Sequence, residues 1–95
     1  MDSSVRTVHV RVKGRVQGVG YRAWVESTAL TMALTGWVRN RRDGSVEIAL
    51  QGPADRVDEM LRRCEQGPPA AHVTKVEIHG EGVGAYDDFE VLPTI

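Results

Sequence analysis

The stretch VRTVHVRVKGRVQGVGYRAW, residues 5–24, decides how the chain begins to fold. Valine alternates with polar side chains over residues 5–13, which predicts a strand with one buried face. Glycines then stand at positions 14, 18 and 20, where they favour a loop. Beyond the loop, apolar residues recur at steps of three and four and predict a helix of about 13 residues on Tyr21, Trp24, Val25, Thr28, Ala29 and Met32.

The residues after this helix predict a β-hairpin. We expect Gly36 to end the helix and a strand to run over residues 37–40. The turn RRDG follows at residues 41–44, where Asp43 and Gly44 favour left-handed backbone angles. Alternating apolar residues then predict the partner strand on Val46, Ile48 and Leu50.

A second helix and two more strands complete the pattern. Gly52 and Pro53 are expected to open the helix, with the proline in its first turn. Its apolar stripe has the spacing i, i+3, i+4, i+7 on Val57, Met60, Leu61 and Cys64. Residues 67–69, GPP, stop it, and strands are predicted over residues 73–78 and 89–92.

The order βαββαβ with a final short strand predicts an α+β fold. In such a split βαβ sandwich, two helices cover one face of an antiparallel sheet. The length of 95 residues, 41% of them hydrophobic, suffices for one core, so we interpret residues 1–95 as a single domain.

Composition argues against several classes of protein. The start of the chain has no secretory signal and no apolar run long enough for a membrane span, so we expect a cytoplasmic protein without a membrane partner. The single cysteine, Cys64, and three histidines without ligand spacing predict no disulfide, no metal and no cofactor. A net charge of −1 argues against a nucleic-acid partner. We expect a monomer.

Basic residues are concentrated in the first half of the chain. Residues 1–44 hold eight Lys and Arg against three Asp and Glu. The excess indicates either an anion-binding site in this half or solvated surface charge. We interpret Arg15, Arg39, Arg41 and Arg42 as surface charge, the tryptophans and Tyr21 as core, and Cys64 as a buried, inert thiol.

Strand direction predicts that two distant polar residues meet. A strand, a crossover helix and a second strand in one sheet leave the two strands parallel, so their carboxyl ends share one edge. The glycine loop with Arg22, and Asn40 at the end of the second strand, should therefore converge. Loop amides, helix-start amides and a guanidinium together suit a phosphate group. Taken singly, Arg22 is also compatible with a solvated arginine and Asn40 with a turn former.

Three other motif interpretations fit less well. Residues 18–23, GVGYRA, match the dinucleotide fingerprint G-x-G-x-x-A, but Asn40 stands where that motif requires an acid, and a hairpin follows where a crossover should. A Walker loop would need a lysine followed by Ser or Thr. An RNA-binding sandwich would need aromatic residues on its exposed sheet, and the chain has five in all.

Residues 14–22, GRVQGVGYR, and 36–52, GWVRNRRDGSVEIALQG, resemble the two signature segments of the acylphosphatase family. The resemblance implies a ferredoxin-like sandwich that hydrolyses acyl phosphates to a carboxylate and inorganic phosphate without a metal. It further implies that Arg22 binds the phosphate and that Asn40 places the attacking water. The implied phosphate cradle is the loop of Arg15, Val16, Gln17, Gly18, Val19, Gly20 and Tyr21.

Three positions depart from the family pattern. Gly20 stands where the family often has a larger residue and Tyr21 where phenylalanine is usual, which we expect to loosen or widen the cradle without removing a donor. Ala33 stands where the family commonly has glycine after the helix, a position suited to left-handed angles. A non-catalytic phosphate-sensing module on the same sandwich stays open as the alternative function.

Overall fold

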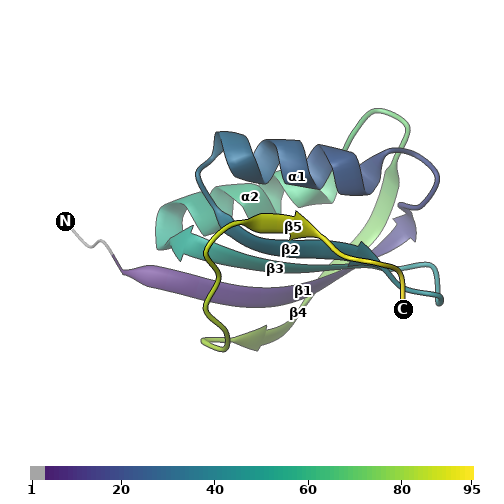
Figure 1. The fold of residues 1–95 in the computed structure, drawn as a ribbon. Helices are drawn as coiled ribbons and strands as arrows, with labels where there is room; N and C mark the ends of the chain where they lie inside the picture. The colour runs from purple at the N-terminus through teal and green to yellow at the C-terminus, as the bar shows by residue number, and fades with distance from the viewer. Residues whose placement is uncertain (1–3) are drawn as a thin grey trace.

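The computed structural model describes residues 4–95, which form a sheet with two helices on one of its faces (Figure 1). The elements in chain order are β1 (Val5–Arg15), α1 (Tyr21–Thr31), β2 (Thr35–Asn40), β3 (Val46–Pro53), α2 (Ala54–Gln66), β4 (His72–Glu81) and β5 (Phe89–Val91). The strand order in the sheet is β4-β1-β3-β2-β5. The first four strands pair antiparallel and β5 adds a short parallel strand beside β2. The predicted ferredoxin-like α+β sandwich with an extra short strand is therefore confirmed.

The core lies between the helices and the sheet. Alternation in β1 and β3 turns one set of apolar side chains toward the helices, and each helix returns an apolar stripe. The residues that meet there are almost fully buried: Val8, Val10, Val12, Val25, Ala29, Val46, Ile48, Leu50, Val57, Met60 and Cys64. Removing this apolar area from water drives the two layers together. Of the two helices in the described part of the chain, neither is long and apolar enough to cross a bilayer.

Helix α1 ends earlier than predicted, because Ala33 rather than Gly36 terminates it. Ala33 has φ 56°, in the left-handed region. Its N–H donates to Leu30 O at 3.1 Å, and the Leu34 N–H donates to Ala29 O at 2.9 Å. These two bonds form a Schellman motif, which satisfies carbonyls that the helix end would otherwise leave unpaired. The expected left-handed geometry at residue 33 is confirmed.

Gly36 instead lies inside β2, where only glycine fits. Its φ is 140°, and a Cβ at this position would come within 1.9 Å of Ala49 O on the neighbouring strand. Close strand pairing, rather than a helix end, therefore accounts for this glycine.

Two further local predictions were wrong. Gly44 adopts φ 94° but Asp43 does not have a positive φ; its carboxylate accepts hydrogen bonds from the N–H and hydroxyl of Ser45 at 2.9 and 2.6 Å. An aspartate that bonds the backbone two residues on closes the turn without the left-handed conformation. Pro53, with φ −54° and ψ 137°, caps α2 from the end of β3 and lies outside the first helical turn.

The topology brings the predicted site residues to one edge. Both β1 and β2 are antiparallel to β3, so they run in the same direction. In Figure 1 both point to the right, toward the side where α1 begins. Loop residues 16–20 and the end of β2 therefore lie at a common edge of the sheet, as the strand directions predict.

Candidate active site

A cleft of about 420 Å³ lies at this edge, in the size range of small-molecule sites. The loop contributes Val16, Gln17, Gly18 and Gly20, and α1 contributes Tyr21, Arg22, Ala23 and Glu26. Asn40 from β2 and Val91 from β5 complete the lining. The cleft thus contains Arg22, Asn40 and most of the predicted cradle. Two predicted cradle residues lie outside it: Arg15 ends β1 with an exposed side chain, and Val19 packs against the core.

The loop leaves backbone donors without partners. Gly18 and Gly20 adopt φ 72° and 78°, which a residue with a Cβ rarely tolerates. No backbone N–H of residues 17–20 donates to another backbone group of the described chain, and the first bonded amide of α1 is that of Trp24, to Gly20 O at 3.0 Å. Unpaired amides at a helix start form a region of positive potential that suits an anion.

Arg22 places an unengaged cation beside these amides. It lies in the first turn of α1 and is half-buried. Its guanidinium makes no hydrogen bond or ion pair with any described residue, although Glu26 follows one helical turn later in the same cleft. Its five N–H donors therefore remain available to an anion with several oxygens.

Asn40 lines the same cleft and carries a buried, unpaired acceptor. It ends β2 on the helix side of the sheet, two residues beyond the buried Val38. Its Oδ1 is buried and has no hydrogen-bond partner among residues 4–95. An unsatisfied buried amide oxygen costs about 1–3 kcal/mol. Such an atom is expected where a ligand or a bound water supplies the missing donor.

Gln17 ties the loop to the turn that follows Asn40. Its Nε2 donates to Arg41 O at 2.7 Å and to Ser45 O at 2.9 Å. The side chain thus faces the hairpin turn, and the two bonds fix the position of the loop relative to the end of β2. A glutamine in a glycine loop gives no sequence signal for this contact, so sequence reasoning missed it.

Tyr21 and Val16 turn their side chains into the core, where each is 1% exposed. The Tyr21 hydroxyl donates to Cys64 O in α2 at 2.7 Å, and burial raises the pKa of this phenol. The hydroxyl that distinguishes tyrosine from phenylalanine is therefore accommodated by α2, away from the cleft. Cys64 is buried as predicted, and burial raises the pKa of its thiol to about 12. That the thiol is inert stays a prediction.

The opposite face of the sheet carries a separate ionic cluster around Glu47, which is 3% exposed. Its carboxylate accepts from Arg39 Nε at 2.8 Å and Arg41 Nη1 at 2.9 Å and contacts His9 Nε2 at 2.5 Å. Burial raises the pKa of Glu47, but these three hydrogen bonds outweigh it and hold the pKa at about 2. The interpretation of Arg39 and Arg41 as plain surface charge was therefore wrong.

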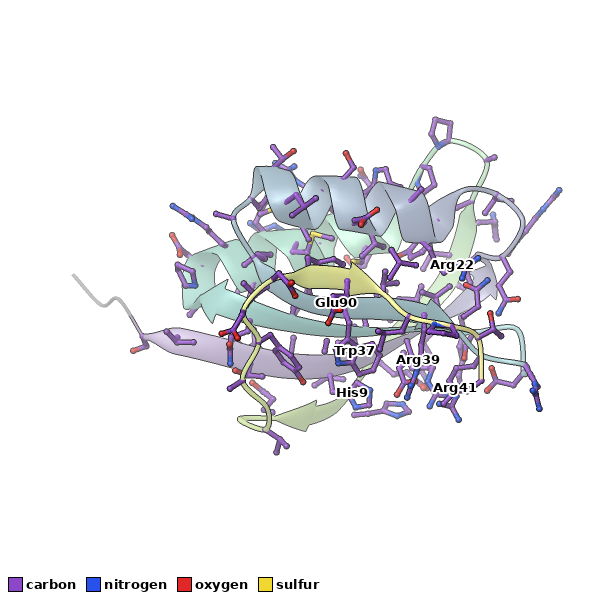
Figure 2. The ribbon with its side chains drawn as sticks, viewed as in Figure 1. His9, Arg22, Trp37, Arg39, Arg41 and Glu90 are labelled. Atoms are coloured by element: carbon purple, nitrogen blue, oxygen red, sulfur yellow. The ribbon has the colours of Figure 1, made fainter. Side chains whose placement is uncertain are left out.

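Trp37 also lies on this open face, against the expectation of a core residue. It is half-buried, with the Arg39 guanidinium 4.7 Å and the His9 ring 5.6 Å from its ring. Figure 2 shows these side chains below the sheet, while Arg22 lies on the helix side. Position 37 alternates with the buried Gly36 and Val38, which explains why it faces outward.

Comparison with known proteins identifies the family to which the chain belongs. The family model for acylphosphatases matches residues 8–91. The chain belongs to the acylphosphatase family. It is 52% identical over 101 residues to an acylphosphatase of Rhodopseudomonas palustris strain BisB18, with both chains covered completely. Solved acylphosphatases are also similar: that of Bacillus subtilis has a TM-score of 0.85 at 33% identity over 94% of this chain and 99% of that one. The acylphosphatase of Coxiella burnetii has a TM-score of 0.87 at 38% identity over 93% of each chain.

Three residues of this acylphosphatase-family cleft were not predicted: Ala23, Glu26 and Val91. Glu26 had a usable signal, because it lies four residues after Arg22 and so on the same face of the helix. Val91 had none, since its place depends on the pairing of β5 with β2, where Val91 lies opposite Val38. Among residues 4–95, no group of three or more His, Cys, Asp or Glu side chains is placed to hold a metal ion.

Proposed function

We propose that this cleft hydrolyses the carboxyl–phosphate bond of acyl phosphates, releasing a carboxylate and inorganic phosphate. Family membership supports the reaction and the substrate class. One observation carries the assignment to this cleft. Two residues that line it each have a polar group without a partner: the buried Oδ1 of Asn40 and the guanidinium of Arg22. One is a pure acceptor and the other a pure donor, as water and phosphate respectively require.

The phosphoryl group is held by Arg22 together with the free main-chain amides of loop residues 17–20. Phosphoryl transfer spreads negative charge over three equatorial oxygens, and donors fixed before the reaction stabilise that charge at little reorganisation cost. The left-handed glycines and the Gln17 tether support a preformed loop.

Asn40 positions the attacking water, whose O–H donates to Oδ1. The water oxygen forms the new bond to phosphorus as the bond between phosphorus and the carboxyl oxygen breaks. An amide is no base at neutral pH, so the proton passes to a phosphoryl oxygen of the substrate. The leaving carboxylate keeps its electron pair and needs no proton. An alkoxide would need a general acid, so acyl phosphates are preferred over alkyl esters.

The test is a pair of substrates. Wild-type protein in excess chelator should hydrolyse benzoyl phosphate and leave ethyl phosphate unhydrolysed, because the ethoxide leaving group of that alkyl ester would need a general acid. Arg22→Lys should lower turnover of benzoyl phosphate about 10²-fold or more, since lysine cannot reproduce the planar fork. Protection against heat by phosphate without turnover of benzoyl phosphate would support a phosphate-sensing module and overturn the proposal. Dependence on an added metal would overturn the metal-free mechanism.

A further inference from the structure

The cleft extends beyond the groups assigned to the phosphoryl end. Ala23 and Glu26 line it from α1, and Val91 lines it from β5. Val91 is 42% exposed, so an apolar side chain of the lining is open to solvent. These three residues form the rim, which the acyl group of a bound substrate meets because its phosphoryl end occupies the loop.

Among residues 4–95, Glu26 is the only acidic residue in the lining. It is half-buried and makes no ion pair or hydrogen bond with a described residue. Arg22 is the only basic residue of the lining in the described part of the chain, and a bound phosphoryl group neutralises it. With substrate in place, the charge that the rim presents to the acyl group is therefore negative.

We propose that Glu26 sets the acyl-group specificity of the cleft: acyl phosphates with a neutral or amine-bearing acyl group are preferred over those that carry a second carboxylate. A carboxylate on the acyl group meets Glu26 as a like charge in a cleft partly shielded from water, while an ammonium group is attracted. Val91 offers an apolar surface to the hydrocarbon part of the acyl group, whichever charge that group carries. This inference rests on the proposed function of the cleft.

Three substrates of similar shape test it: benzoyl phosphate, 4-carboxybenzoyl phosphate and 4-(aminomethyl)benzoyl phosphate. For wild-type protein, kcat/KM should be highest for the aminomethyl compound and lowest for the carboxy compound. Up to about fivefold per unit of acyl charge is expected, as for partly exposed charge pairs at a protein surface. This spread in kcat/KM among the three substrates should narrow as salt is added, because salt screens the interaction of the charges.

Variants then assign the effect to one residue. Glu26→Gln should remove most of the difference in kcat/KM among the three substrates. Glu26→Lys should reverse the order, so that the carboxy compound has the highest kcat/KM. Glu90→Gln is the matched control, because it removes the same charge one residue from Val91. Glu90 pairs with Trp37 and lies on the open side of the sheet (Figure 2). It should leave the spread unchanged.

The outcomes separate this inference from the proposed function. A spread that Glu26→Gln leaves intact, or that Glu90→Gln narrows equally, overturns the role of Glu26 even if Arg22→Lys is inactive. No hydrolysis of any of the three compounds by wild type, or full activity of Arg22→Lys, overturns the assignment of the cleft itself. If thermal unfolding shows that Glu26→Lys does not fold, Glu26→Gln decides alone.

Discussion

Replacement of Ala33 by glycine should stabilise the protein. Ala33 is held at φ 56° by the Schellman motif that ends α1, and its side chain is exposed, so the methyl group contributes little packing. The left-handed conformation costs an L-residue with a Cβ about 1–2 kcal/mol. Glycine avoids that cost but loses about 0.4–1 kcal/mol through the greater freedom of the unfolded chain. Taken at the middle of these two ranges, the net gain in the free energy of unfolding is about 0.5–1 kcal/mol.

For a domain of this size, that gain corresponds to a rise in Tm of about 2–8 °C. Thermal and urea unfolding of Ala33→Gly measure it. Ala23→Gly is the matched control, because it makes the same substitution at a helical position of α1 and should destabilise the protein by up to about 1 kcal/mol. An unchanged or lower Tm for Ala33→Gly would show that residue 33 does not hold the left-handed conformation in solution.

Three other predictions concern acid stability, the loop and the thiol. Because the folded-state pKa of Glu47 is depressed to about 2 from 4.5, its contribution is present above pH 4.5 and is lost as the pH falls toward 2. Measured by urea unfolding, the free energy of unfolding of wild type should fall by up to about 3 kcal/mol more than that of Glu47→Gln between pH 4.5 and 2. The same pH dependence of stability in both proteins would contradict this. Gln17→Ala should cost about 1–2 kcal/mol of stability and lower kcat/KM for benzoyl phosphate about tenfold, whereas Gln66→Ala on the exposed end of α2 should do neither. The Cys64 thiol should react with a disulfide reagent only at the rate of unfolding, so rapid labelling of native protein would disprove its burial.

The sequence predicted the layers and the meeting of Arg22 with Asn40, because both follow from periodicity and strand direction. Alternation identified the buried faces of β1 and β3, and the parallel relation of β1 and β2 brought their ends to one edge. The prediction for Trp37 was wrong because it relied on the size of the side chain, which suggested burial. The alternation along β2 instead places Trp37 on the open face of the sheet.

What the sequence did not predict depends on contacts between distant segments. Gly36 resembles a helix stop, and its real constraint, the Ala49 carbonyl, becomes visible only once β2 and β3 are paired. The tether from Gln17 and the approach of Val91 to the cleft likewise require the register of the hairpin and of β5. Arg39 and Arg41 have the sequence pattern of solvated charge, because Glu47, the buried carboxylate that binds both guanidinium groups, lies on the neighbouring strand.

The most direct test of the central claim is turnover and phosphate binding measured together on Asn40→Ala. If Asn40 positions the water while Arg22 and the loop hold the phosphoryl group, kcat for benzoyl phosphate should fall about 10²-fold or more. The Kd for inorganic phosphate, from calorimetry, should stay within about threefold of wild type, since that variant keeps the loop and Arg22. Near-normal turnover, or a loss of phosphate affinity that accounts for the lost rate, would contradict the account.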